Sequence, residues 1–215
     1  MPEVTPELSY FQSDRHELLP LFPTGIRFAL DVGCGDGLLG LSLRQRGIQV
    51  WGIEKDPYAA SRARRHLDRV FCADVEAFEV PCQPESFDCL IYADILEHTK
   101  DPWRTLLNHR RYLRPGGYVV SSIPNIRYYR TLRDLVLKGT WNYVESGILD
   151  KTHLRFFTLS SIQSLFQGAG FEILRTERNV VASRNKLLLN RLCGDRLKDL
   201  LTFQYYLVAR RHDPV

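Results

Sequence analysis

The sequence predicts an α/β fold, a doubly wound and mostly parallel sheet with helices on both faces. Short apolar runs of strand length alternate with helical segments over residues 27–92. A glycine-rich turn at residues 33–37 follows the first apolar run and directly precedes a helical segment. Acidic residues stand where successive apolar runs end, and these ends form the edge at which open parallel sheets bind ligands.

Length and composition predict one domain with a full hydrophobic core. The chain has 215 residues, of which 44% are hydrophobic, so we expect one domain over residues 1–215. The formal net charge of +4 is modest and lacks the clustered basic signature of a nucleic-acid binder, so no nucleic-acid partner is expected. We see no secretory signal and no apolar run of the ~20 residues that a membrane span needs. We therefore expect a cytoplasmic protein, monomeric or homodimeric.

The five cysteines predict neither a metal site nor a disulfide framework. They stand at positions 34, 72, 82, 89 and 193, and no two of them form a C-x-x-C pair. Reduced, mostly buried thiols and no bound metal are expected.

The turn after the first strand predicts a nucleotide-binding edge. The strand at residues 27–32 ends in Gly33-Cys34-Gly35-Asp36-Gly37, and a helix is expected over residues 37–46. Glycine lets the backbone turn sharply and approach a ligand closely. A strand, a tight glycine turn and a helix start together are typical of a nucleotide site.

The same turn also matches a dinucleotide fingerprint. Residues 35–40 read G-x-G-x-x-G, and Glu54 stands where that fingerprint has its acid. However, Asp31 and Asp36 flank the turn, and each would repel the pyrophosphate that a dinucleotide places there. A ligand with an ammonium and a sulfonium group and no phosphate, such as S-adenosylmethionine, suits two carboxylates better.

The remaining elements follow in order along the chain. Further strands are expected near residues 49–53, 70–73, 87–92, 118–123, 171–178 and 204–210. Helices are expected near residues 13–19, 57–68 and 102–113, from residue 158 to about 168, and over 185–201 with a break at Gly194. Asp101 with Pro102, and Thr158, are expected to begin their helices as capping residues.

Five motifs stand in register with the expected strands. They are Asp31-Val32-Gly33-Cys34-Gly35, Val50-Trp51-Gly52-Ile53-Glu54, Phe71-Cys72-Ala73-Asp74, Phe87-Asp88-Cys89-Leu90-Ile91-Tyr92 and Leu113-Arg114-Pro115-Gly116-Gly117. In this order they resemble the class I S-adenosylmethionine-dependent methyltransferases over most of the chain. The resemblance implies a seven-stranded sheet whose last strand is antiparallel, S-adenosylmethionine as cofactor, and methyl transfer as the activity.

Roles for the acidic residues follow from their places at the strand ends. Glu54 can accept hydrogen bonds from both ribose hydroxyls, because a carboxylate is an acceptor with two oxygens. Asp74 can accept from the adenine amino group, with the Val75 backbone N–H at the ring, or it can cap the following turn. Asp31 is expected to hold the methionine ammonium. Asp36 can do the same or cap the helix beside it.

The expected cofactor site also includes a basic residue from the segment before the first strand. The resemblance implies that Arg15 pairs with the cofactor carboxylate, although a solvated arginine on a surface helix is an equal alternative. The full expected set is Arg15, Asp31, Gly33, Cys34, Gly35, Asp36, Gly37, Glu54, Lys55, Asp74, Val75, Tyr92, Ala93 and His98.

Residues 124–157 form an insertion that we expect to cover the acceptor pocket. The segment follows the fifth strand at the cofactor edge and is rich in aromatic residues, arginine, asparagine and histidine. Three tentative catalytic residues are His153, His98 and Tyr128, the histidines as bases and the tyrosine to orient the acceptor. For each histidine, a framework or pocket-shaping role is the alternative. The run from Asp150 to Thr158 resembles methyltransferases of polysaccharide and other small-molecule pathways.

The function predicted from these features is methyl transfer to an oxygen or nitrogen of a small molecule, such as a sugar, lipid or quinone precursor. The alternatives are a nucleic-acid or protein methyltransferase and, in another class, an NAD(P)-binding oxidoreductase. The Tyr-Ala-Asp-Ile sequence after the fourth strand lacks the Asn-Pro-Pro-Tyr type of motif that amino-group methylases of bases carry.

Overall fold

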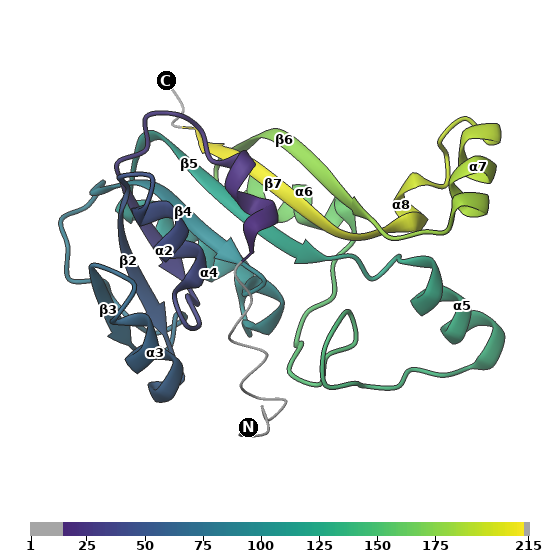
Figure 1. The fold of residues 1–215 in the computed structure, drawn as a ribbon, viewed down its shortest axis with the longest axis horizontal. Coiled ribbons are helices and arrows are strands. Elements are labelled where there is room, and N and C mark those ends of the chain that lie inside the picture. Colours follow the sequence, from purple (N-terminus) through teal and green to yellow (C-terminus); the bar gives the residue numbers. More distant parts are fainter. Residues whose placement is uncertain (1–14, 213–215) are drawn as a thin grey trace.

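A seven-stranded sheet forms the centre of the protein (Figure 1). The computed structural model describes residues 15–212. The strands lie in the order β3-β2-β1-β4-β5-β7-β6. Strands β1 to β5 pair in parallel, and β7 runs antiparallel to both β5 and β6. This arrangement confirms the predicted fold, including the antiparallel last strand. The strands are β1 (Phe28–Val32), β2 (Gln49–Glu54), β3 (Arg69–Cys72), β4 (Phe87–Ala93), β5 (Leu113–Pro124), β6 (Phe171–Val180) and β7 (Thr202–Arg211).

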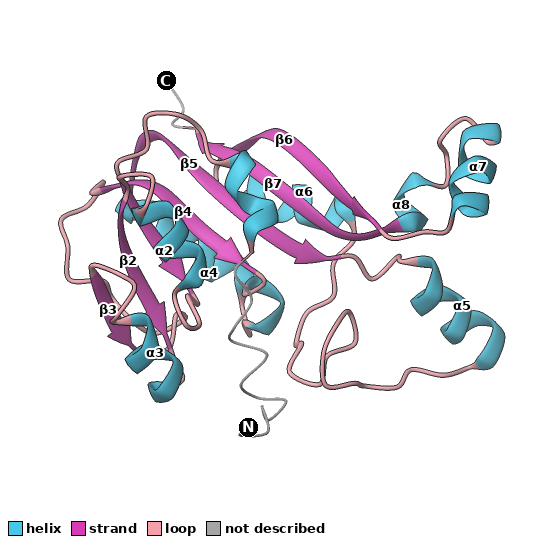
Figure 2. Cartoon of the chain, viewed as in Figure 1, coloured by secondary structure: helices cyan, strands magenta, loops and turns pink. Residues whose placement is uncertain are grey.

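Helices cover both faces of the sheet, as Figure 2 shows. The α-helices are α2 (Leu38–Arg44), α3 (Pro57–Ala63), α4 (Pro102–His109), α5 (Tyr129–Lys138), α6 (Leu159–Gly168), α7 (Arg184–Leu192) and α8 (Lys198–Leu201). The 3₁₀ helices are η1 (His16–Leu21), η2 (Leu96–His98) and η3 (Arg110–Tyr112).

The two faces of the sheet bury separate hydrophobic cores. On one face, Leu106 of α4 and Leu165 of α6 share a core with Leu30 of β1. On the other face, Leu39 of α2 shares a core with Ala29 of β1 and with residues of η1. Successive strand residues point to opposite faces, so a strand in the middle of this sheet is apolar on both sides. The continuous apolar runs in the sequence reflect this burial.

Side-chain caps begin three of the helices, and two of these caps, Asp101 and Thr158, are predicted from the sequence. Asp56 caps α3 by accepting from the Ala59 N–H, and Asp101 caps α4 with Pro102 as the first helical residue. Thr158 and Ser161 form a capping box at the start of α6. Since each cap satisfies N–H groups that have no partner within the helix, it fixes where the helix begins.

Some element boundaries differ from the predictions. The second crossover helix ends at Ala63 and not at residue 68, and α4 ends at His109 before a 3₁₀ turn. The helix predicted at 13–19 is the 3₁₀ helix η1, which contains Pro20, and residues 13 and 14 lie outside the described residues. The predicted break in the segment 185–201 is present, because α7 and α8 are separate helices on either side of Gly194.

The segment after β5 extends away from the sheet, and its two ends pair with each other. Asn125 and Phe157 form an isolated bridge, and the Ile126 N–H donates to the Phe157 carbonyl at 2.9 Å. Between these residues, α5 has no buried side chain, and it lies with α7 at the same end of the molecule (Figure 1). Among the described residues, no helix is long and apolar enough to cross a membrane.

Candidate functional site

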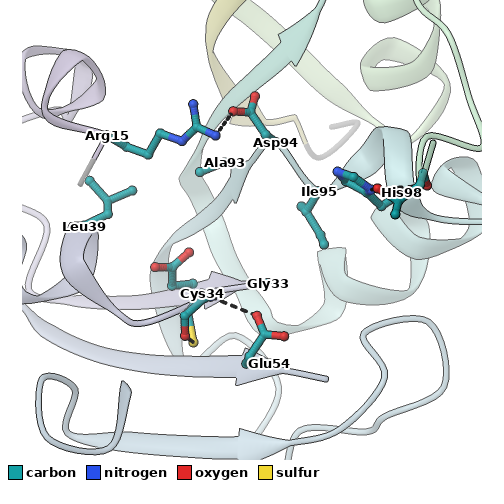
Figure 3. A pocket seen from close by; sticks show the side chains of 12 residues that line it. Arg15, Gly33, Cys34, Leu39, Glu54, Ala93, Asp94, Ile95 and His98 are labelled. Carbon is teal, nitrogen blue, oxygen red and sulfur yellow. Dashed lines mark hydrogen bonds and ion pairs between the residues drawn. The ribbon is translucent and has the colours of Figure 1, made fainter. Parts of the chain in front are cut away.

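A cavity of about 270 Å³ opens where β1, β2 and β4 end (Figure 3). Parallel strands bring their carboxyl ends to one edge, so residues far apart in the sequence meet there. The lining residues come from the glycine turn, the strand ends, the segment before β1 and the insertion. They are Arg15, Asp31, Gly33, Cys34, Gly35, Leu39, Glu54, Ala93, Asp94, Ile95, His98 and Thr152.

The glycine turn is held against β2 and cannot carry a side chain at its first position. The N–H groups of Gly33 and Cys34 both donate to the Ile53 carbonyl, at 2.8 and 3.0 Å. Gly33 has a φ of 75°, and a Cβ there would lie 2.6 Å from Cδ1 of Ile95. Glycine therefore satisfies both the backbone conformation and the close approach of the loop after β4.

Asp31 places a buried carboxylate at the floor of this cavity. Its exposed fraction is 2%, and Oδ1 accepts no hydrogen bond from a described residue. Burial, followed by repulsion from the Glu54 carboxylate, raises the pKa of Asp31 to about 7. A carboxylate in this state favours the arrival of a cation, which would restore the ionised form.

Glu54 ends β2, and each of its carboxylate oxygens accepts a hydrogen bond from a backbone N–H group. Oε2 accepts from the Gly35 N–H at 2.9 Å, and Oε1 accepts from the Asp56 N–H at 2.8 Å. Each oxygen has a second lone pair, so the carboxylate can accept two further hydrogen bonds from hydroxyl groups.

Arg15 faces the cavity from the residue before η1 and pairs with Asp94 (Figure 3). Asp94 also accepts from the Ser122 hydroxyl at 2.8 Å and from the Gln204 amide. Both Arg15 and Asp94 have left-handed backbone conformations, with φ of 48° and 52°. A guanidinium has five N–H donors, so Arg15 can hold a second carboxylate beside Asp94.

His98 lines the cavity beside Thr152 of the insertion, and its ring contacts a second histidine. His98 Nδ1 lies 3.0 Å from the Thr152 hydroxyl oxygen and 3.3 Å from the Thr152 carbonyl oxygen. The His98 and His153 rings meet edge to face with centroids 4.6 Å apart. Burial, with a smaller effect from His153, lowers the pKa of His98, so its ring is neutral at neutral pH.

The charges of the cavity fit the cofactor that the resemblance implies. Asp31 offers an unpaired, buried oxygen to an ammonium group, and Arg15 offers donors to a carboxylate. Glu54 offers two acceptor positions to a ribose. These three groups are the ones assigned from the sequence, and the structure brings them to one cavity.

Two predicted residues of the glycine turn do not face the cavity. Asp36 points to α3, where its carboxylate forms an ion pair with Arg62 at 2.7 Å. It does not cap α2 either, because the N-cap residue of that helix is Gly37 and no side-chain cap is present. A Cβ on Gly37 would lie 3.1 Å from Cγ of Leu67, so this glycine permits close packing, and it is not among the residues that line the cavity. Both assignments to the cofactor site are corrected.

Tyr92 and Tyr128 also lie away from the cavity, where the sequence predicted them. Tyr92 is fully buried on the face of the sheet that packs against α4, with its hydroxyl 3.1 Å from His109 Nδ1. Tyr128 is buried too, and its hydroxyl donates to the Val181 carbonyl at 2.8 Å. Neither hydroxyl reaches the cavity, so the cofactor role for Tyr92 and the catalytic role for Tyr128 are corrected. Both hydroxyls anchor structural elements.

The predicted adenine residues lie outside the cavity. Lys55 Nζ and the Asp74 carboxylate form an ion pair at 2.9 Å, and Lys55 lowers the pKa of Asp74. Asp74 also accepts from the Glu76 N–H at 3.0 Å, which is the turn cap considered as its alternative role. The side chain of Val75 is buried. Adenine binding by Asp74 and Val75 remains a prediction.

Four lining residues were not assigned from the sequence. Asp94 and Ile95 directly follow β4, so their place at a strand end was a usable signal. Leu39 lies in the helix after the glycine turn. Thr152 reaches the cavity through a contact between segments 54 residues apart, and no local pattern marks such a contact.

Comparisons with known proteins agree with this geometry. A family model described as a methyltransferase domain matches residues 7–176. The chain is similar to the ubiquinone biosynthesis O-methyltransferase of Cereibacter sphaeroides, with 28% identity over 165 residues that cover 74% of this chain and 65% of the relative. The protein of that name from Coxiella burnetii is 27% identical over 155 residues, covering 69% of this chain and 64% of the relative. The chain thus spans just under two thirds of the length of these relatives.

Solved structures show the same fold. An S-adenosylmethionine-dependent methyltransferase from Mesorhizobium loti superposes with a TM-score of 0.64 at 20% identity, covering 91% of this chain and 96% of that one. A SAM-dependent methyltransferase from Archaeoglobus fulgidus superposes with a TM-score of 0.66 at 17% identity, covering 90% of each chain.

Proposed function

This chain belongs to the S-adenosylmethionine-dependent methyltransferase family, and we propose that it transfers a methyl group to an oxygen of a small molecule with a flat, unsaturated ring. The observation that carries the proposal is the charge pattern of the cavity. A buried anion, an anchored arginine and an acceptor-rich glutamate stand at the edge where β1, β2 and β4 end. This pattern matches the ammonium, carboxylate and ribose of one ligand.

The chain's own residues would bind and orient the cofactor. Asp31 would pair with the ammonium, Arg15 with the carboxylate and Glu54 with the ribose hydroxyls. The cofactor, when bound, supplies a methyl group on a positively charged sulfur. Since that group is already activated, the protein's main tasks are to position the acceptor and to exclude water.

A ring-shaped acceptor is supported by the aromatic side chains next to the cavity. From His98 at the wall, ring contacts continue to His153 at 4.6 Å, to Phe156 at 6.4 Å and to Trp141 at 5.3 Å between centroids. Aromatic side chains beside a pocket favour ligands with rings, and a few polar groups fix their orientation. The O-methyltransferase names of the curated relatives support oxygen as the acceptor atom and a quinone precursor as the acceptor class.

The G-x-G-x-x-G run by itself does not decide between a dinucleotide and S-adenosylmethionine, because the last glycine of a dinucleotide fingerprint also serves helix packing. Gly40, the last glycine of the G-x-G-x-x-G run, would place a Cβ 2.2 Å from Cδ2 of Leu67. Its small size therefore serves the packing of α2 on its neighbours. The family model, however, matches a methyltransferase domain and not a dehydrogenase.

Two measurements test the proposal. In calorimetry, S-adenosylhomocysteine should bind with one site per chain and NAD should not. With radiolabelled methyl donor, a panel of dihydroxylated aromatic compounds, sugars, amines, nucleic acids and proteins should show incorporation into the aromatic compounds. Binding of NAD in place of the cofactor product would overturn the family-based reading. Labelling of only an amine, a sugar or a macromolecule would overturn the acceptor class.

A further inference from the structure

Two imidazoles and a carboxylate meet behind the cavity wall. Glu97 and His98 belong to η2, and His153 belongs to the end of the insertion. One possible ligand atom from each of the three lies within 4.8 Å of the others. The three residues come from segments more than 50 residues apart, so the fold and not the local sequence assembles this cluster.

Glu97 is the unusual member of the cluster, because its carboxylate is buried without a hydrogen bond from the part of the chain that the structure describes. Its exposed fraction is 1%, and neither carboxylate oxygen has a hydrogen-bond partner among the described residues. Buried charges are normally paired or coordinate metals, since the loss of hydration is otherwise uncompensated. The environment of Glu97 therefore indicates a ligand that brings positive charge.

The two histidines are held as metal ligands usually are, through hydrogen bonds from the other ring nitrogen. His153 Nδ1 lies 3.0 Å from the Ile148 carbonyl oxygen, so this nitrogen is the donor and Nε2 has the lone pair. The Thr152 hydroxyl donates to Asp150 at 2.7 Å, so it accepts from His98 Nδ1–H. Such outer partners fix the tautomer and the ring orientation of metal-binding histidines.

We propose that Glu97, His98 and His153 bind one divalent transition-metal ion, with Zn²⁺ as the representative ion. Imidazole nitrogens suit zinc and its neighbours, whereas Mg²⁺ prefers oxygen ligands. Ligand atoms around zinc, at 2.0–2.1 Å from the ion, are roughly 3.3 Å apart, so the three side chains close inward by small rotations on binding. Three protein ligands leave one position open, as in catalytic zinc sites.

The place of the site connects it to the proposed reaction. His98 lines the cavity, so an ion bound to it borders the space where the acceptor is expected. In that position the ion would polarise an acceptor oxygen and favour loss of its proton to water. This role rests on the proposed function, whereas ion binding does not and is measured without cofactor or acceptor.

The test uses the untagged full chain after removal of metal with a chelator. Co²⁺ is the probe, because it replaces Zn²⁺ and its visible absorption reports nitrogen ligation. We expect one Co²⁺ per chain, displacement by one equivalent of Zn²⁺, and no displacement by millimolar Mg²⁺. Glu97→Gln should keep the fold, since its carboxylate accepts no hydrogen bond, and should weaken binding at least about tenfold.

The controls make each outcome decisive. His153→Gln should also lose the absorption band. His66→Gln should retain it, because His66 is not part of the cluster and has Nδ1 2.7 Å from the Asp36 carbonyl oxygen. An absence of stoichiometric Co²⁺ binding by the folded protein overturns the proposal. Wild-type affinity in Glu97→Gln, or equal competition by Mg²⁺, overturns it as well. Methyl transfer that persists in chelator leaves the proposed function intact and removes only the catalytic role of the ion.

Discussion

Replacing Asp31 with asparagine separates the electrostatic role of this residue from its structural one. Burial and the nearby Glu54 raise the Asp31 pKa from 3.8 to about 7. This shift of about 3 pKa units corresponds to about 4 kcal/mol of unfavourable ionisation in the ligand-free fold. An asparagine of the same shape removes that charge, although its amide needs hydrogen-bond partners that an aspartate does not.

The sign of the pH dependence follows from linkage. Because the folded protein holds this proton more tightly than the unfolded chain, Asp31 makes the wild type less stable as the pH rises from about 4 to about 7. Between pH 5 and pH 8 the free energy of unfolding of Asp31→Asn should therefore gain about 3 kcal/mol relative to wild type. Urea unfolding of the ligand-free proteins at both pH values measures this difference directly.

The cofactor affinity of the wild type should increase with pH, whereas its stability decreases. An ammonium group needs the ionised carboxylate, so the wild-type affinity for S-adenosylhomocysteine should increase from pH 6 to pH 8. Asp31→Asn should bind at least about tenfold more weakly and without this pH dependence, since a hydrogen bond to a charged group contributes about 1.5–3 kcal/mol.

Asp36→Asn is the matched control for both measurements. Its carboxylate pairs with Arg62 outside the cavity, so this substitution should leave cofactor affinity within a few-fold of wild type. Equal pH profiles for wild type and Asp31→Asn would refute the assignment of Asp31. A larger loss of binding in Asp36→Asn than in Asp31→Asn would also refute it.

The remaining predictions concern single contacts. Glu54→Gln should weaken calorimetric binding of S-adenosylhomocysteine by about 1.5–3 kcal/mol, and an unchanged dissociation constant would contradict the ribose role. Tyr128→Phe should lower the free energy of unfolding by about 1 kcal/mol, because one hydrogen bond is lost, and should leave kcat near wild type. A large loss of kcat with normal stability would restore the catalytic role of Tyr128. Thr158→Ala should cost about 1 kcal/mol in urea unfolding through loss of the capping box, and an unchanged midpoint would contradict the cap. Amide exchange should be fast over α5 and slow at Leu154; uniform protection across the insertion would contradict a docked end and an exposed middle.

The order of the elements was predictable because it depends on local patterns. Strands that are buried on both faces give continuous apolar runs, and caps such as Asp101 and Thr158 mark helix starts by chemistry alone. Helix ends were less predictable. Arg64 to Leu67 still bond to α3 in turns that are not regular helix, and no residue in the sequence distinguishes that case.

The site was predictable where topology determines it and unpredictable where packing does. Asp31 and Glu54 end neighbouring parallel strands, so both had to reach the same edge. Asp36 stands only five residues from Asp31, yet the packing of α3 gives it Arg62 as a partner. In β4, Tyr92 lies on the same face of the sheet as Leu90 and is buried in the core. The residues next to it in the strand are apolar, so the sequence of this strand does not indicate which side chains face the ligand.

The contact between η2 and the insertion explains why the histidines were hard to assign. The Glu97 carbonyl accepts from the N–H groups of Leu154 and Arg155, at 2.8 and 3.0 Å, so backbone atoms of any sequence could make this junction. Once it forms, His98 is brought next to Thr152 and His153. The framework and functional roles considered for these histidines are therefore not exclusive. The bonds that orient each ring hold the insertion in place, and they leave the buried Glu97 carboxylate facing two oriented imidazoles.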